Sequence, residues 1–373
     1  MTHFCTYFDR GFLAQGVALA DSLRQHAAET VLWVLCLDDA TEAVLARLAH
    51  PAIRTVSLRT LESADPELAQ SRPGRTAVEY IFTLSPCWPR YLLRQHPDVP
   101  AVTYLDADTY WFASPATFLA ALEEASVLLT EHRHPPYLAH HARYGRFNVG
   151  ILSFRNDEIG RACLDDWRER CIAWCHDRVE DGRYADQRYL DAWPARWGER
   201  VRVIGRPGIN LAPWNWRAHV CSVRADGSVW VDHAPLELFH FARFRPLVGD
   251  WWFQSGQLEY GVMPWRLRQR IYGAYWRALR EARRRIRRAD PSFAFETPHH
   301  RRWHQWWRAL VPRAVFGSDW LRLGPWFISG RVGLGRHSGQ VLAGLRRWRE
   351  AWHGDTTAGS RRRLRRLSLP GRG

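Results

Sequence analysis

Hydrophobic and polar positions in the first 263 residues follow two periods that alternate along the chain. Short apolar runs are typical of buried strands, whereas apolar residues spaced three or four apart are typical of helices that pack on a sheet. Strands are predicted at residues 3–8, 31–37, 53–58, 101–105, 127–130, 147–154 and 201–204, and helices at 11–26, 41–48, 76–96, 157–176 and 184–193. Strands that alternate with helices predict an α/β fold with a largely parallel sheet.

Turn-forming residues and prolines mark where these elements begin and end. Thr41 is predicted to cap the helix over residues 41–48, because its hydroxyl can accept a hydrogen bond from a free backbone N–H. The proline-containing segment 63–74 is predicted to be a loop, and a hairpin is predicted around residues 225–227. Pro86 and Pro89 are expected to start a new turn within the helix at 76–96.

Two acidic residues follow the apolar strand 101–105, in the stretch AVTYLDADTYWF. In extended backbone, residues i and i+2 point the same way, so Asp106 and Asp108 share one face. Two carboxylates held together repel each other unless a positive charge lies between them, and Mg²⁺ or Mn²⁺ prefers such ligands. Ligands of largely parallel sheets bind beyond the carboxyl ends of the strands, where this pair lies. A pair of solvated turn residues is the alternative interpretation.

The composition is that of a globular protein of one large or two ordinary domains, because 373 residues suffice for a sizeable core. The seven cysteines form no C-x-x-C pair and no leader precedes them, so we expect reduced thiols in a cytoplasmic protein. Cys171 and Cys175 lie one helical turn apart beside His176, which is compatible with a zinc site or with unreacted thiols on a helix. No apolar stretch is long enough to span a bilayer.

The net charge of +15 is concentrated at one end of the chain. Residues 264–373 hold 26 Arg against six acidic residues, whereas residues 1–263 hold 27 Arg against 32. A basic helix is predicted over residues 260–288, with one apolar side formed by Ile271, Tyr275, Leu279 and Ile286. Such a helix fits an anionic membrane surface, and a solvated, partly disordered tail is the alternative. No nucleic-acid-binding motif accompanies the charge, so nucleic acid is the disfavoured partner.

Seven stretches in this order resemble a nucleotide-diphospho-sugar glycosyltransferase of the GT-A type, related to glycosyltransferase family 8. They are TYFDRGFLAQGVALADSL, EYIFTLSPCWPRYLL, VTYLDADTYWF, FNVGILSFRND, YADQRYLDAW, INLAPWNW and LFHFARF. The resemblance implies a Rossmann-like GT-A domain over residues 1–262, with a mixed, mostly parallel sheet. Residues 263–300 would then form a basic helical extension, and residues 301–373 a Trp- and Arg-rich, partly disordered tail.

The resemblance also implies a metal site and a nucleotide site. Asp106-Ala107-Asp108 matches the family's D-x-D motif, and His240 in LFHFARF matches its third Mn²⁺ or Mg²⁺ ligand. A histidine packed among phenylalanines is the alternative for His240. Tyr7 and Asp9 match the loop that holds the base and ribose, although Tyr7 is equally compatible with an ordinary aromatic residue at a strand end.

Further residues match the positions around the two sugars. Asn148 and Gly150 correspond to the acceptor-facing strand. Asp186 and Gln187 match a D-Q pair beside the transferred sugar, where either could steady an oxocarbenium-like centre during a retaining transfer. An acid placed for helix capping is the alternative for Asp186. The family's diphosphate-binding lysine is missing here, and Arg243 or Arg245 is the candidate substitute.

The expected function is a metal-dependent, hexosyltransferase-like enzyme that moves a sugar from a nucleotide donor, UDP-linked, to a cell-surface glycan or its lipid-linked precursor. It is expected in the cytoplasm, at the inner face of the membrane. A nucleotidylyltransferase is the alternative within the enzyme class, although the segment FDRGFLAQG is a poor match to its Gly-rich, basic phosphate loop. A non-catalytic basic protein that binds membrane or nucleic acid is the alternative from another class.

Overall fold

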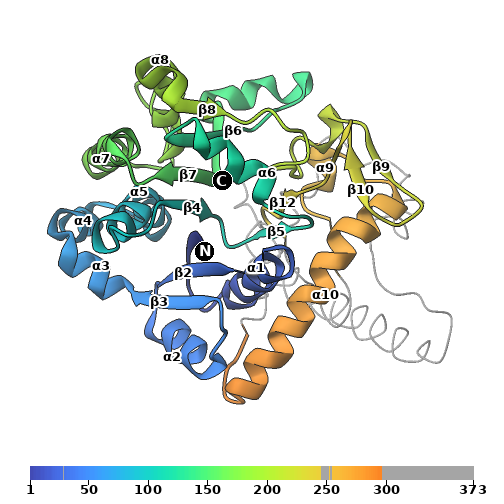
Figure 1. Cartoon of the computed structure of the whole chain (residues 1–373), viewed down its shortest axis with the longest axis horizontal. Helices are drawn as coiled ribbons and strands as arrows, with labels where there is room; N and C mark the ends of the chain where they lie inside the picture. Colours follow the sequence, from blue (N-terminus) through green and yellow to red (C-terminus); the bar gives the residue numbers. More distant parts are fainter. Residues whose placement is uncertain (28, 245–251, 253, 296–373) are drawn as a thin grey trace, which may run out of the picture.

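A seven-stranded sheet forms the centre of the computed structural model, which describes residues 1–27, 29–244, 252 and 254–295 (Figure 1). The strand order is β3-β2-β1-β4-β7-β6-β8. The bounds are β1 (Thr2–Phe8), β2 (Thr30–Cys36), β3 (Ile53–Ser57), β4 (Ala101–Leu105), β6 (Val127–Glu131), β7 (Phe147–Arg155) and β8 (Val201–Val203). Every strand predicted for this sheet is present, with ends close to those predicted.

The directions of the strands confirm a mixed, mostly parallel sheet. The strands β3, β2, β1 and β4 are parallel to one another, and β8 is parallel to β6. Only β7 among these seven strands runs antiparallel to its neighbours, β4 and β6. Because β1 and β4 pair in parallel, their carboxyl ends lie at the same edge, and this brings Tyr7 close to Asp106.

Two hydrophobic clusters cover the two faces of the sheet. Phe4 and Phe8 of β1 belong to one cluster, while Cys5 belongs to the other, as expected for side chains that alternate along a strand. The first cluster includes residues of α1 (Leu13–His26), α2 (Asp39–Leu48) and α10 (Trp265–Ala289). The second includes residues of α3 (Leu58–Ala64), α4 (Pro66–Ser71), α5 (Ala77–Gln95), α7 (Glu158–Ala173) and α8 (Trp193–Trp197).

Shorter helices complete the described part of the chain. They are α6 (Ala116–Leu119) and α9 (Gln257–Tyr260), together with the 3₁₀ segments η1 (Arg72–Gly74), η2 (Ala120–Glu123), η3 (Pro136–Tyr144), η4 (Gln187–Ala192), η5 (Gly198–Arg200) and η6 (Trp216–Ala218). The helix predicted at residues 184–193 is therefore only one 3₁₀ segment, followed by α8.

The cap predicted for α2 is wrong by three residues. The helix begins at Asp39, and the carboxylate of Asp38 accepts a hydrogen bond from the Thr41 backbone N–H at 2.7 Å. Asp38 lies two residues after the end of β2 and has extended backbone, which is the usual conformation of an N-cap residue. Thr41 is instead buried in the first turn.

The loop predicted at residues 63–74 is also wrong, because this segment continues α3 and forms α4 and η1. Pro66 occupies the start of α4, where the missing N–H of proline costs no hydrogen bond. The carboxylate of Asp65 caps the same helix by accepting from the Leu68 N–H at 3.2 Å. Proline here starts a helix rather than breaking one.

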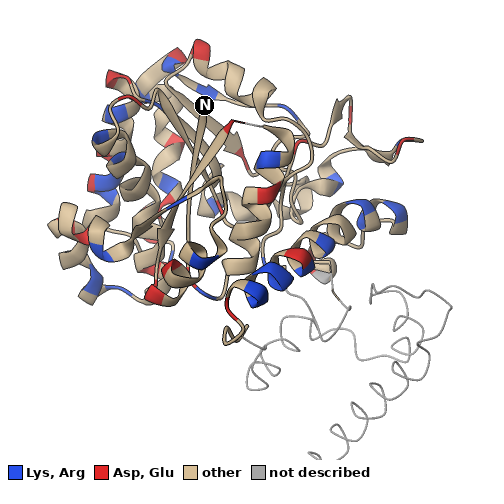
Figure 2. Cartoon of the chain, turned by 60° about the horizontal axis from the view of Figure 1, so that its bottom comes forward, with Lys and Arg blue, Asp and Glu red and all other residues tan. Residues whose placement is uncertain are grey.

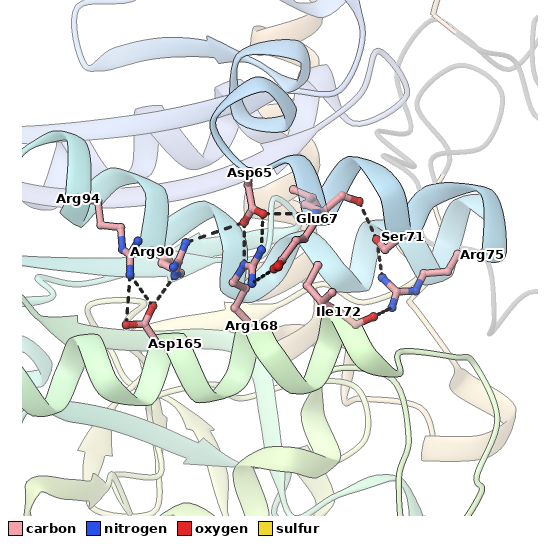
Figure 3. Close-up of polar contacts among 10 residues, drawn as sticks. Asp65, Glu67, Ser71, Arg75, Arg90, Arg94, Asp165, Arg168 and Ile172 are labelled. Carbon is pink, nitrogen blue, oxygen red and sulfur yellow. Dashed lines mark hydrogen bonds and ion pairs between the residues drawn. The ribbon is translucent and has the colours of Figure 1, made fainter.

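Figure 3 shows how this helical segment is joined to α5 and α7 by charged side chains. The buried Arg168 of α7 donates from its Nε to Asp65 at 2.8 Å, and a second guanidinium nitrogen completes a two-pronged ion pair. Arg90 of α5 lies 3.9 Å from the same carboxylate. Arg75 donates to the carbonyl groups of Cys171 and Ile172 at the end of α7, both at 2.6 Å.

Helix α5 runs unbroken through Pro86 and Pro89, contrary to the predicted new turn. Its start is fixed by a capping box, in which the Thr76 N–H donates to Glu79 at 2.8 Å and the Glu79 N–H donates to Thr76. Both prolines are buried, and α5 packs on α7 and β4. We attribute the continuity to this packing, which offsets the hydrogen bonds that proline removes.

A small two-stranded sheet carries the chain back to the edge of the main sheet. It pairs β5 (Thr109–Trp111) with β12 (Leu238–His240) in antiparallel fashion, so His240 lies opposite Thr109. Between them in sequence, β9 (Cys221–Val223), β10 (Val229–Val231) and β11 (Ala234–Pro235) form a three-stranded sheet. The hairpin predicted around residues 225–227 joins β9 to β10.

The apolar side of α10 is packed against the protein. Ile271, Tyr275, Leu279 and Ile286 are at most 2% exposed and belong to the same hydrophobic cluster as α1 and α2. Figure 2 shows the arginine positions spread along this helix, most of them exposed or half-buried, whereas Arg268 is buried. The apolar side of the helix is therefore not available to a membrane surface. Within the described residues, no helix is both long and apolar enough to cross a bilayer. The predicted tail at 301–373 lies outside the described residues.

Candidate active site

Asp106, Asp108 and His240 meet at the carboxyl end of β4. The backbone turns directly after β4, with the Thr109 N–H donating to the Asp106 carbonyl at 3.0 Å, and then enters β5. Because β5 pairs with β12, His240 lies beside the acidic pair. Its Nε2 lies 3.1 Å from Asp108 Oδ1 and 3.5 Å from Asp106 Oδ2. One ligand atom from each residue falls within 4.8 Å of the others.

The negative charges of Asp106 and Asp108 lie close together, so a bound cation would stabilise this cluster. Burial raises the pKa of Asp106, the neighbouring charge of Asp108 raises it further, and His240 only partly opposes both effects. Burial lowers the pKa of His240, but the charge and hydrogen bond of Asp108 outweigh burial, so the net pKa is raised. Two carboxylates with one imidazole nitrogen form a donor set that fits Mn²⁺ or Mg²⁺. Ala107 is buried in the hydrophobic core and contributes no side-chain ligand.

Two residues that the sequence analysis did not single out take part in the site, Tyr104 at Asp106 and Ser85 at Tyr7. The hydroxyl of Tyr104 donates to Asp106 Oδ1 at 2.7 Å, and the hydroxyl groups of Tyr7 and Ser85 lie 2.9 Å apart. The rings of Tyr7 and Tyr104 are 5.5 Å apart. Tyr104 lies two residues before Asp106 on a strand, so the period of two was a usable signal. Ser85 comes from α5, and no local pattern indicates it.

Asp186 is buried beside Ser85. Burial and the charge of Asp106 raise its pKa to about 7, although a hydrogen bond from Ser85 acts in the opposite direction. Asp186 also lies at the N-cap position of η4, where the backbone N–H of Gln187 acts to lower its pKa. The preceding residue, Ala185, has a left-handed backbone with φ of 44°, a conformation that alanine rarely adopts. Gln187 donates from Nε2 to the Tyr144 carbonyl at 2.7 Å.

We expect Asp186→Asn to raise the free energy of unfolding at pH 8 by about 2–4 kcal/mol and to leave it nearly unchanged at pH 4. The unfolded carboxyl loses its proton near pH 4, whereas the folded one retains it to about pH 7. The folded state therefore binds more protons in this window, and wild-type stability falls as the pH rises through it. Urea unfolding in EDTA at both pH values measures the difference. An equal effect at both pH values would contradict this prediction.

The remaining predicted site residues are dispersed around this centre. Asp9 accepts a hydrogen bond from the Gly11 N–H at 2.9 Å and so stabilises its own turn. The side chain of Arg243 is 77% exposed and lies 3.9 Å from Glu259, and Arg245 lies outside the described residues. Asn148 and Gly150 of β7 are buried directly behind His240.

The zinc interpretation of residues 171–176 is not supported. Cys171 and Cys175 are buried free thiols, although Cys175 lies beyond the end of α7 rather than on the predicted helix, and His176 lies 3.1 Å from Glu79. Across the part of the chain that the structure describes, the cluster of Asp106, Asp108 and His240 is the one group of three or more such side chains with metal-binding geometry.

Comparison with known proteins places the chain in a family. It is 32% identical over 251 residues to the uncharacterized protein YfnF of Bacillus subtilis (strain 168), covering 65% of this chain and 81% of YfnF. The uncharacterized protein YfnD of the same strain is 31% identical over 245 residues, covering 65% of this chain and 78% of YfnD. The chain belongs to the YfnF and YfnD family. No family model matches it.

Solved structures similar to this member of the YfnF and YfnD family include glycosyltransferases. The galactosyltransferase LgtC, in complex with donor and acceptor sugar analogues, is 15% identical with a TM-score of 0.45, covering 83% of this chain and all of LgtC. GlyE of Streptococcus pneumoniae TIGR4 is 14% identical with a TM-score of 0.44, covering 80% of this chain and 66% of GlyE. Mouse xyloside xylosyltransferase 1 is 13% identical with a TM-score of 0.41, covering 65% and 98%.

Proposed function

We propose that this protein is a metal-dependent glycosyltransferase of the GT-A type, which transfers a sugar from a nucleotide-diphosphate donor to a glycan or lipid-linked acceptor. The observation that carries the proposal is the convergence of Asp106, Asp108 and His240 at the carboxyl edge of a largely parallel sheet. Ligands of such sheets bind at this edge, and a divalent ion held by carboxylates suits a diphosphate. UDP is the first nucleotide to test.

Each part of the site has a role in this reaction. Asp106, Asp108 and His240 would hold a divalent ion, which neutralises the diphosphate as it leaves the sugar. Tyr104 orients Asp106 through its hydrogen bond, and burial keeps bulk water from the Asp186 carboxyl. Asp186 and Gln187 are the candidates for steadying positive charge on the sugar ring, and a retaining transfer is the stereochemical outcome we propose.

The test is calorimetric titration of UDP and GDP, each with and without Mn²⁺, into wild type and Asp108→Ala. We expect UDP to bind wild type in a Mn²⁺-dependent manner. We expect Asp108→Ala to weaken this binding by at least about 100-fold, because one of the three protein ligands is lost. Asp39→Ala is the matched control, since Asp39 is 90% exposed at the start of α2. Failure of both nucleotides to bind wild type under every condition would overturn the proposal.

A further inference from the structure

A buried polar network lies behind His240, on the side away from the two carboxylates. Asn148 of β7 is 7% exposed, and Asn210, from the loop after β8, is fully buried. The Asn148 side chain contacts four partners. Its Oδ1 lies 3.1 Å from the Gly150 backbone nitrogen, 3.1 Å from Asn210 Nδ2 and 3.4 Å from His240 Nδ1, and its Nδ2 lies 3.2 Å from His132 Nε2.

The orientation of the Asn148 amide is fixed by these contacts. A backbone N–H can only donate, so the atom that faces Gly150 is the oxygen of the amide. The Asn148 NH₂ group then donates to Nε2 of His132, whose Nδ1 donates to the Arg146 carbonyl at 3.3 Å. Asn210 is held in turn, because its Nδ2 also donates to the Thr130 hydroxyl at 2.9 Å.

The fixed amide determines which nitrogen of His240 carries the proton. Asn148 Oδ1 is an acceptor, so Nδ1 of His240 must be the donor across their 3.4 Å contact. The Nε2 atom then faces Asp106 and Asp108, to which it can donate its own proton or, after losing that proton, present its lone pair to a cation held between them. Trp214 packs against the His240 ring at 79°, with centroids 5.2 Å apart, and restrains its rotation. Histidine ligands of metals are generally oriented by such a hydrogen bond on the other nitrogen.

We propose that Asn148 is a positioning residue that holds His240 in the Nδ1–H tautomer, with Nε2 presented to a divalent cation at the acidic pair. The inference rests on the proposed metal site and assigns Asn148 a role that faces inward, to His240, rather than outward to an acceptor. Gly150 serves the same arrangement, because a Cβ there would lie 2.5 Å from His240 Nδ1.

The direct test is long-range ¹H–¹⁵N correlation spectroscopy of protein labelled with ¹⁵N-histidine, which reads the protonation of each ring nitrogen without metal or substrate. His240→Gln identifies the His240 signals among the 17 histidines. We expect Nδ1 of His240 to carry a proton in wild type, whether or not Nε2 is also protonated. In Asn148→Leu this preference should be lost, whereas Asn148→Asp, which keeps the acceptor, should retain it. Asn156→Leu is the matched control, since Asn156 follows the other end of β7 and donates to the carbonyl groups of Leu93, Pro97 and Val99.

The second readout is Mn²⁺ affinity, measured from the free Mn²⁺ signal in electron paramagnetic resonance with UDP present. We expect Asn148→Leu to weaken Mn²⁺ binding by about 10–100-fold and Asn156→Leu to leave it unchanged. An unaltered His240 tautomer and Mn²⁺ affinity in folded Asn148→Leu would overturn the inference. If that variant does not fold, Asn210→Gly replaces it, because glycine tolerates the φ of 56° at this position. Absence of Mn²⁺ binding in wild type would instead overturn the proposed function, and the tautomer would still decide the inference.

Discussion

Replacing Arg168 with methionine is expected to lower the free energy of unfolding by about 3–5 kcal/mol, the usual cost of removing one partner from a buried ion pair. The side chains of Arg168 and Asp65 are only 10% and 7% exposed, and two hydrogen bonds join them (Figure 3). Without Arg168 the Asp65 carboxylate stays buried, with Arg90 at 3.9 Å as its nearest cation among the described ion pairs. Urea unfolding at pH 7 measures the loss.

The double variant Asp65→Ser/Arg168→Met separates charge from packing. Serine can still cap α4 and leaves no buried charge, so we expect the double variant to be more stable than Arg168→Met alone. Burial would raise the pKa of Asp65, but Arg168 and the Leu68 N–H outweigh burial and lower it. The ion pair therefore stabilises wild type above about pH 4, and this contribution is lost as the pH falls through the lowered pKa. A double variant that is less stable than Arg168→Met would contradict the charge explanation.

Adding one methyl group at Gly150 is expected to abolish Mn²⁺-dependent UDP binding. The Cβ of Gly150→Ala would lie 2.5 Å from His240 Nδ1 and 2.6 Å from Asn148 Oδ1, which is closer than non-bonded atoms can approach. Neither neighbour can move away freely, because Asn148 is hydrogen-bonded on both sides and His240 packs on Trp214. We expect His240 to leave the acidic pair, with at least about 100-fold weaker binding and about 1–3 kcal/mol lower stability.

Gly205→Ala provides the control for this prediction. Gly205 follows β8, and a Cβ there would meet no atom within 4 Å. We expect Gly205→Ala to bind UDP and Mn²⁺ as wild type does. Calorimetric titration gives the affinity, and a thermal unfolding curve gives the change in stability. Wild-type affinity in Gly150→Ala would show that His240 is not held where the structure places it.

The local sequence pattern was sufficient to predict elements that depend on residues close together in the chain. β-Branched and apolar runs identified the strands of the central sheet, and the two-residue period placed both carboxylates of Asp106 and Asp108 on one face. The same rules failed at residues 63–74, because Pro66 reads both as a breaker and as the first residue of a helix. They also failed at Pro86 and Pro89, where burial rather than propensity keeps α5 continuous.

Some residues of the site could likewise be predicted from local sequence, whereas others are brought there only by long-range contacts. Tyr104 could have been found from its spacing to Asp106, whereas Ser85 could not, because α5 reaches Tyr7 only in the folded chain. His240 entered the site through a family resemblance, and the pairing of β12 with β5 gives the physical reason. Asn148 was expected to face an acceptor, which stays a prediction, and its contact with the His240 ring was not indicated by any local pattern.

By itself, the sequence determined the α/β class, the strands of the central sheet and the acidic pair at the end of β4, because these depend on side chains close together in the chain. Only the tertiary structure decided the rest. It packed the apolar side of α10 against α1 and α2, and it raised the pKa of Asp186 by burial beside Asp106. It also surrounded His240 with two carboxylates on one side and an amide on the other. These features join residues far apart in the chain, and no local period records such contacts.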